Sequence, residues 1–170
     1  WAQGFGAQSN LGSTAMASGM NSSTWGGTMG YEWHKNRHDK VGVLFGAANT
    51  HYRLDGGGQN ARQTTYTAGV YGSHTWTKTK LDGSLLLGQY HATSRRQIAL
   101  LSSTAEGETD GFSAGLDTGI GHRFELGDDV TMTPRAGLRV LVATTNAYHE
   151  TGAPGANLAI DGSTQTRLQS

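Results

Sequence analysis

The feature that most constrains the fold of this chain is a residue period of two that continues over unusually long segments. Between residues 24 and 34 the odd positions carry Trp25, Gly27, Met29, Tyr31 and Trp33, whereas the even positions carry only small, polar or charged residues. Successive side chains of a β-strand point to opposite faces, so this alternation predicts a strand with one apolar and one polar face.

The same alternation recurs along the chain at residues 62–76, 111–124 and 130–142. It is less clean at 41–53 and 81–93, where leucines at positions 44 and 86 interrupt the polar face. We therefore expect about seven strands of roughly 9–16 residues, a short additional strand near 157–160, and no helix. This predicts an all-β chain forming one domain, or a piece of a larger one, over residues 1–170.

The length of the strands and of their connections favours a membrane barrel. Strands of soluble proteins average about 5–6 residues, whereas a tilted strand needs about 9–11 residues to cross the hydrocarbon layer. Long linkers rich in Gly, Ser, Asn and Thr alternate with short charged ones. The long linkers lie around 10–23, 54–61 (with the run Gly56-Gly57-Gly58, expected to be a flexible tip) and 94–108, and the short ones around 35–40, 77–80 and 126–129. Outer-membrane barrels place short turns in the periplasm and long loops outside, so the first strand is expected to run outward.

A barrel also explains the composition. Lipid cannot pair with backbone N–H and C=O groups, so a sheet survives there only as a closed ring without edges. Such a wall has a lipid-facing side and a lumen side, which fits a hydrophobic fraction of only 35%. Glycines on the polar face are expected to keep the bore open. Trp25, Trp33 and Trp76 lie near strand ends, where membrane-interface aromatics are expected. A soluble β-sandwich is the alternative, with the glycines acting as bend points.

Composition and motifs exclude several other classes. Lys+Arg and Asp+Glu both number 13, which argues against nucleic-acid binding because that requires clustered positive charge. The chain has no cysteine, so it has no disulfide, thiol nucleophile or Cys-ligated zinc. His34 and His38 are spaced as metal ligands would be on a helix, but here a strand end meets a turn and no third ligand is evident. No catalytic or phosphate-binding motif occurs, so we expect neither cofactor nor metal, and no enzyme.

Spaced residues over nearly the whole chain carry a resemblance to a known family. Residues 1–6, 26–32 and 41–48 are similar to that family's first three strands, and residues 133–138 and 148–153 to an "x-P-x-A-x-L" strand and the "aromatic-x-E-x-G" after it. The sequence thus resembles the translocator (β) domain of bacterial autotransporters, which belong to type V secretion. The resemblance implies a transmembrane antiparallel up-and-down β-barrel of about twelve strands. Seven or eight strands would then be part of a larger barrel, without its last strand and its pore helix; a self-contained eight-stranded barrel is the rival.

The resemblance also implies a function and partners. An autotransporter barrel anchors in the bacterial outer membrane and translocates an N-terminal passenger to the cell surface. Its partners would be outer-membrane lipid, its own passenger and pore helix, and the barrel-assembly machinery. A β-rich outer-membrane or surface adhesin or binding module is the alternative function, followed by a barrel lipid hydrolase using Ser and His on the wall.

Charged residues on the polar face are the candidate functional residues. An Arg facing lipid near mid-membrane costs about 2–4 kcal/mol, so these side chains are expected to face the lumen. Their role stays open: they either pair across the bore and hold the wall, or contact the plug helix or the passing passenger. The candidates are Glu32, Asp117, Arg123, Arg135, Arg139 and Glu150.

Overall fold

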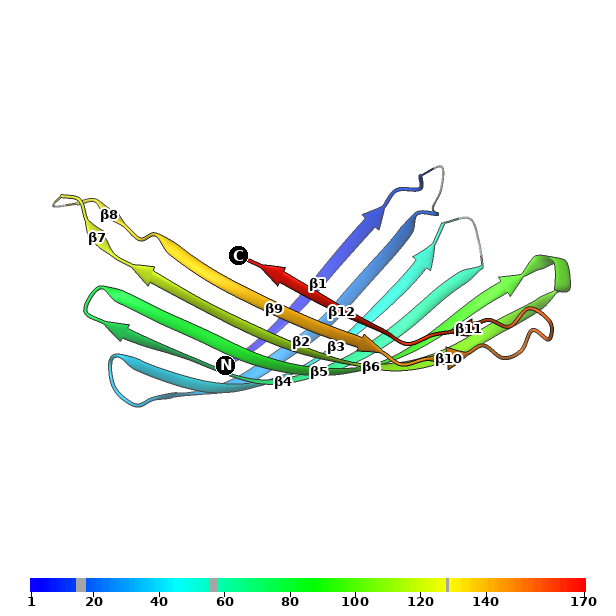
Figure 1. Ribbon diagram of the computed structural model, residues 1–170, viewed down its shortest axis with the longest axis horizontal. Helices are drawn as coiled ribbons and strands as arrows, with labels where there is room; N and C mark the ends of the chain where they lie inside the picture. Colours follow the sequence, from blue (N-terminus) through cyan, green and yellow to red (C-terminus); the bar gives the residue numbers. More distant parts are fainter. Residues whose placement is uncertain (15–17, 56–57, 128) are drawn as a thin grey trace.

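The computed structural model describes residues 1–14, 18–55, 58–127 and 129–170. Its main element is an eight-stranded antiparallel sheet of order β1-β2-β3-β4-β5-β6-β9-β12 (Figure 1). The strands are β1 (Ala2–Leu11), β2 (Met20–His34), β3 (Asp39–Leu54), β4 (Gln59–Trp76), β5 (Thr79–Ile98), β6 (Ser103–His122), β9 (Arg135–Thr145) and β12 (Ser163–Gln169).

The topology is an up-and-down meander, because each strand pairs antiparallel with the next large strand of the chain. Two small ladders lie in the connections: β7 (Phe124–Glu125) with β8 (Thr131–Met132), and β10 (Tyr148–His149) with β11 (Ala159–Ile160). The predicted all-β, antiparallel, up-and-down architecture is confirmed, with eight strands in the sheet. The short strand expected near 157–160 is β11.

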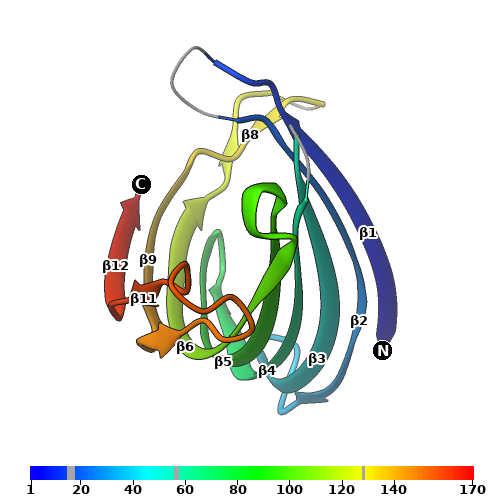
Figure 2. The same ribbon diagram turned by 90° about the vertical axis from the view of Figure 1, so that its right-hand side faces the viewer.

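The sheet curves into a trough, as Figure 2 shows from the loop end, with β1 and β12 at its opposite rims. Within the described residues no ladder joins these two edge strands. The eight strands therefore do not close on themselves, which contradicts the self-contained eight-stranded barrel considered above.

The strands on the loop side are longer than the sequence suggested. β5 and β6 each have 20 residues and are joined by a 3-10 turn, η1 (Ala99–Leu101). The long linker predicted at 94–108 was therefore wrong, because pairing continues to Ile98↔Ser103. The hydrophobic alternation stops earlier than the ladder, since both faces of these strand ends are polar. Of the glycine run at 56–58, Gly56 and Gly57 lie outside the described residues.

The strand predicted at 130–142 was displaced. A short hairpin of β7 and β8 occupies its start, and β9 begins only at Arg135, directly after Pro134. Proline has no N–H to donate to a ladder, so it separates the hairpin from the main sheet. Of the short turn predicted at 126–129, Asp128 lies outside the described residues.

The described residues do not form a large buried core. Among the described residues, only Ala105 and Ala153 are buried apolar residues. Trp25 and Met29 are 61% and 64% exposed, and Leu116 is 49% exposed. In the described ranges no second sheet covers this face, which contradicts the β-sandwich alternative. The same residues contain no helix long and apolar enough to cross a bilayer.

Candidate pore-lining face

The polar face of the sheet is its concave face. The indole Nε1 of Trp1, the residue before β1, donates a hydrogen bond of 2.8 Å to the hydroxyl of Tyr71 on β4. Strands β2 and β3 lie between them, so their backbones are about 14 Å apart across a flat sheet. The two rings are nevertheless 6.4 Å apart. The curve of the sheet brings these side chains, three strands apart, together on its inner side.

A polar chain continues from Tyr71 along this face. The Tyr71 hydroxyl donates to Oε2 of Glu32 at 3.3 Å, and Oε1 of Glu32 lies 3.2 Å from Nζ of Lys40 and 3.0 Å from Nε2 of His34. Glu32 was a candidate from sequence, whereas Trp1 and Tyr71 were missed. The alternation places Tyr71 on the polar face, but only charged residues were considered there as candidates.

Two glycines make this arrangement sterically feasible. A Cβ at Gly42 would lie 2.3 Å from Cζ of Tyr71, and a Cβ at Gly30 would lie 2.6 Å from the Trp1 indole. The aromatic rings thus lie directly over glycine backbone on neighbouring strands. Glycines on this face were expected to keep the bore open, and in the structure these two make room for aromatic side chains.

Two further ion pairs lie on β5, β6 and β9. Arg139 Nε is 2.7 Å from Oδ2 of Asp117, its direct partner in the ladder. Arg135 pairs with Asp82 on β5, which sequence reasoning did not identify, by crossing over β6. It passes over Gly119, where a Cβ would lie 2.7 Å from Arg135 Nη2.

The two leucines that interrupt the polar pattern lie in one row across the concave face, together with a third leucine on β9. Leu44, Leu86 and Leu141 alternate in register with Gly69 and Gly115. A Cβ at Gly69 would lie 2.4 Å from Cδ2 of Leu86, so the row packs leucine against glycine. The broken alternation therefore marks an apolar row within the polar face and does not change the register.

The remaining candidates lie near the two ends of the sheet. At the loop end, Glu150 is the buried charged residue of the described chain, with 8% exposure. Its carboxylate pairs with Arg96 of β5 at 2.5 Å and accepts the Leu158 backbone N–H at 3.0 Å. The hydrogen bonds from Arg96 hold the pKa of Glu150 below its ordinary value despite burial, with the Leu158 N–H assisting.

Glu150 thereby fixes the connection between β9 and β12 inside the trough (Figure 2). Arg96 also donates to the Ala156 carbonyl at 2.9 Å, and Thr151 exchanges backbone hydrogen bonds of 2.8 Å with Glu106 on β6. Arg96 was not a candidate from sequence, because it lay in a predicted linker. Arg123 lies at the opposite end, in the break between β6 and β7, where its backbone N–H donates to the Lys78 carbonyl at 2.7 Å.

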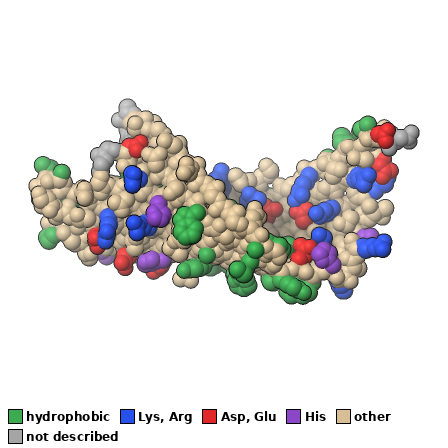
Figure 3. All heavy atoms as spheres, turned by 180° about the vertical axis from the view of Figure 1, so that it is seen from behind, with side chains coloured by type: hydrophobic (Ala, Val, Ile, Leu, Met, Phe, Trp, Pro, Cys, Tyr) green, Lys and Arg blue, Asp and Glu red, His purple; other side chains and the backbone are tan. Residues whose placement is uncertain are grey.

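The convex face carries an apolar belt, part of which is visible in green in Figure 3. On β4 it runs from Tyr66 to Trp76, which corresponds to about 33 Å along the strand and about 25 Å after a tilt of about 40°. Trp33 and Trp76 border it at the turn end, and Trp25 at the loop end. Trp33 packs edge-on against Tyr31, and Trp76 against His74. The exposed belt includes Trp25, Met29, Tyr31, Trp33, Val41, Phe45, Tyr66, Val70, Trp76, Leu81, Leu85, Leu87, Phe112, Leu116, Ile120 and Leu138.

Over its whole length, residues 1–170, the chain matches the family described as "Autotransporter beta-domain". The chain belongs to this family. The family resemblance inferred from the sequence is thus confirmed. Members of the family are outer-membrane β-barrels of Gram-negative bacteria, which confirms the predicted location.

Solved structures give the same fold. The translocator domain of autotransporter NalP from Neisseria meningitidis is 17% identical with a TM-score of 0.80, over 98% of this chain and 56% of that one. The β domain of the Bordetella autotransporter BrkA is 22% identical with a TM-score of 0.64, over 99% of this chain and 66% of that one. The ferric yersiniabactin uptake receptor FyuA from Yersinia pestis is 11% identical with a TM-score of 0.54, over 94% of this chain and 26% of that one.

The chain thus spans 56% and 66% of the length of these two autotransporter domains. No curated protein matches it.

Proposed function

We propose that residues 1–170 form part of one translocator domain, the wall of an outer-membrane pore that carries an N-terminal passenger to the cell surface and anchors it there. The observation that carries this proposal is the two-faced sheet of a chain that belongs to the autotransporter β-domain family. Its convex face is an apolar belt about 25 Å tall, the height expected for a membrane barrel. Its concave face is polar and ion-paired.

The concave charges support a water-filled or plugged lumen. Arg135 and Arg139 lie opposite the belt, so the cost of about 2–4 kcal/mol for an Arg in lipid does not arise. Both pair with aspartates of the same wall. We infer that they stiffen the wall, while Glu32 and the aromatic side chains next to it contact the pore helix or the passenger. Trp25, Trp33 and Trp76 would lie at the two membrane interfaces.

Translocation by this wall requires no bond-breaking step. The barrel would be inserted by the barrel-assembly machinery, and folding of the passenger outside would supply free energy. We therefore propose a transport pore without catalytic activity. Hydrolysis of phospholipids or chromogenic esters that one Ser substitution abolishes would refute this part of the proposal.

Cysteine labelling tests the two faces directly, because the chain has no cysteine of its own. Leu116 points to the belt, and its neighbour Gly115 lies on the concave face with no atom closer than 3.7 Å to an added Cβ. In the full-length protein in vesicles, a water-soluble maleimide should label Gly115→Cys and leave Leu116→Cys unreacted. Equal labelling of both thiols would refute the two-faced wall.

Transport is tested in cells that express the full-length protein with an epitope in the passenger. Protease added to intact cells should remove the epitope when the barrel is present, and the barrel itself should need detergent for extraction. A protein that dissolves in buffer and leaves the epitope protected would favour the adhesin or binding-module alternative.

A further inference from the structure

A basic patch lies on the convex face, between the apolar belt and the loops. It consists of His51 and Arg53 on β3 and Arg62 on β4, which are adjacent in the ladder because His51 is the direct partner of Arg62. All three belong to the same face as Phe45 and Tyr66 of the belt, since each lies an even number of residues from the belt residue on its own strand. Figure 3 shows blue and purple side chains gathered on this side of the belt, at the loop end.

The positive charge of the patch is not neutralised within the sheet. Among the described residues, Arg53 and Arg62 make no ion pair. On the neighbouring strands β5 and β6 the basic residues are paired with carboxylates: Arg95 with Glu106 at 3.0 Å and His91 with Asp110 at 2.9 Å. The nearby carboxylate of Asp55 accepts a hydrogen bond of 3.0 Å from Asn21.

Polar side chains surround the two free arginines. A surface hollow of about 760 Å³ in this region is lined by neutral hydrogen-bonding residues beside the arginines, among them Gln8, Asn21 and Asn60. Arginine binds phosphate through two parallel N–H···O bonds. The hollow therefore offers both the charge and the donors that a phosphorylated group requires.

The patch lies at the height of a lipid headgroup. Arg62 is four residues from Tyr66 at the edge of the belt, about 13 Å along β4 and about 10 Å higher after the strand tilt. The headgroup layer of each leaflet is about 5–8 Å thick. Arginine side chains on the strand above this layer can extend toward the headgroups, so the guanidinium groups reach the level of the phosphates.

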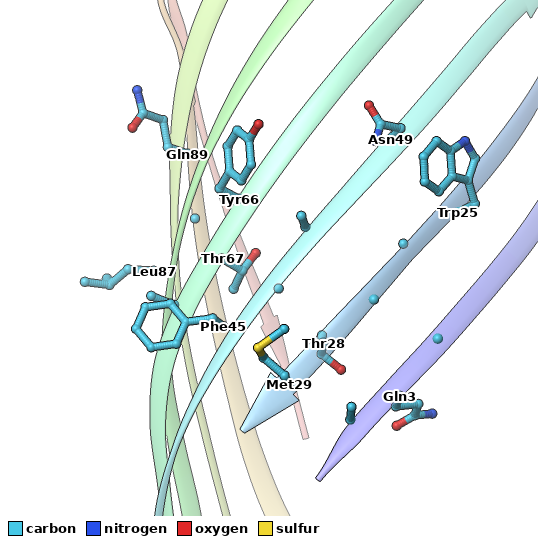
Figure 4. Close-up of a pocket in the computed structure, with 18 of the residues that line it drawn as sticks. Gln3, Trp25, Thr28, Met29, Phe45, Asn49, Tyr66, Thr67, Leu87 and Gln89 are labelled. Atoms are coloured by element: carbon cyan, nitrogen blue, oxygen red, sulfur yellow. The ribbon is translucent and has the colours of Figure 1, made fainter. Parts of the chain in front are cut away.

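An apolar hollow lies directly below the patch on the same strands. It has a volume of about 960 Å³ and is open to the outside. Small residues, Gly27, Ala47 and Ala68, form its floor, and Trp25, Met29 and Phe45 stand around it (Figure 4). Small residues beside large ones leave a groove in which an acyl chain can lie.

We propose that the convex face of β2–β4 is a binding site for a phosphorylated glycolipid of the outer leaflet. The phosphate binds Arg53 and Arg62, and an acyl chain lies in the groove over Ala47. The charge of the patch and its continuity with the apolar groove favour this occupant over a second protein copy. The arginines match the phosphate of a lipid, and the groove on the same strands matches its acyl chain. The inference depends on the proposed outer-membrane orientation, with the loops outside.

Lipid retention tests the site in the full-length protein. The protein is purified in a neutral detergent and titrated with bisphosphorylated lipid A, monophosphoryl lipid A or phosphatidylethanolamine, and bound lipid is counted by native mass spectrometry. Each Arg near an anionic lipid surface contributes about a factor of five to binding. Arg53→Gln/Arg62→Gln should thus weaken binding of bisphosphorylated lipid A about thirty-fold, and removal of one phosphate from the lipid should weaken binding to the unaltered protein.

The matched control is Lys35→Gln/Arg37→Gln, which removes the same charge from the turn at the opposite end. It should bind lipid A as the unaltered protein does. Equal retention by both double variants, or a change in oligomeric mass without loss of lipid, would overturn the proposal. If Arg53→Gln/Arg62→Gln fails to fold, binding of bisphosphorylated lipid A to the unaltered protein is measured at increasing salt concentration. Binding that does not weaken with salt also overturns the proposal. Passenger display, measured in parallel, reports failure of the proposed function separately.

Discussion

The buried carboxylate of Glu150 gives the sharpest test of how the loop end is held. The change Glu150→Gln keeps the shape of the side chain but replaces one carboxylate oxygen with an NH₂ group. In the structure one oxygen accepts from Arg96 Nη2 at 2.5 Å and from Leu158 N at 3.0 Å, and the other accepts from Arg96 Nε at 3.3 Å. The amide of Gln has only one oxygen to accept these N–H groups. Its NH₂ group would therefore face at least one N–H of Arg96 or Leu158, so that two donors oppose each other.

The expected loss follows from this geometry. A hydrogen bond to a charged group contributes about 1.5–3 kcal/mol. Because the side chain of Arg96 is 23% exposed, water compensates for part of the loss, and we expect about 2 kcal/mol. Undocking of the loop should then become about thirty-fold more frequent.

Hydrogen exchange measures this undocking directly. The backbone N–H groups of Glu150 and Thr151 donate to Leu158 and Glu106 when the loop is docked, each at 2.8 Å. Their protection should fall about thirty-fold in Glu150→Gln, whereas amides in the centre of the sheet keep theirs. The control is Arg95→Gln, which breaks an exposed ion pair on the opposite face and should change the protection little. Unchanged protection in Glu150→Gln, or an equal fall in the control, would refute the role given to this carboxylate.

Three further outcomes are expected. The pKa of Glu150 is lowered when the loop is docked, so the contribution of Glu150 to docking is complete above the ordinary value of 4.5 and is lost as pH falls below it. Hydrogen-exchange rates corrected for pH should show constant docking from neutral pH down to 4.5 and weaker docking beneath it. Weaker docking already at higher pH would contradict this assignment. Gly42→Ala should destabilise the wall by about 1–3 kcal/mol in denaturant unfolding, because it displaces Tyr71, while Gly115→Ala on the same face should have little effect. Leu116→Arg should cost about 2–4 kcal/mol in the same assay if lipid covers the belt, and a neutral result would argue against a membrane position.

Much of the fold followed from local pattern. The alternation between residues 24 and 34 predicted β2 and its two faces, because strand geometry forces neighbouring side chains apart. The prediction from alternation failed where the two faces of a strand no longer lie in different environments. Beyond the belt both faces of β5 and β6 are polar, so a paired ladder resembled a linker over 94–108. Pro134 ended a strand that the pattern alone would have continued.

The polar face was predictable, but its pairings were not. Sequence identified Arg135 as a charge facing away from the belt, and it could not identify Asp82 as the partner, because that contact requires β5, β6 and β9 side by side and a glycine between them. Likewise, Arg96 finds Glu150 only because a connection 54 residues away folds back into the trough. Alternation is a property of one strand, so the sequence alone determined which side of the wall each residue faces. Contacts between strands depend on curvature and register, and these were decided by the tertiary structure.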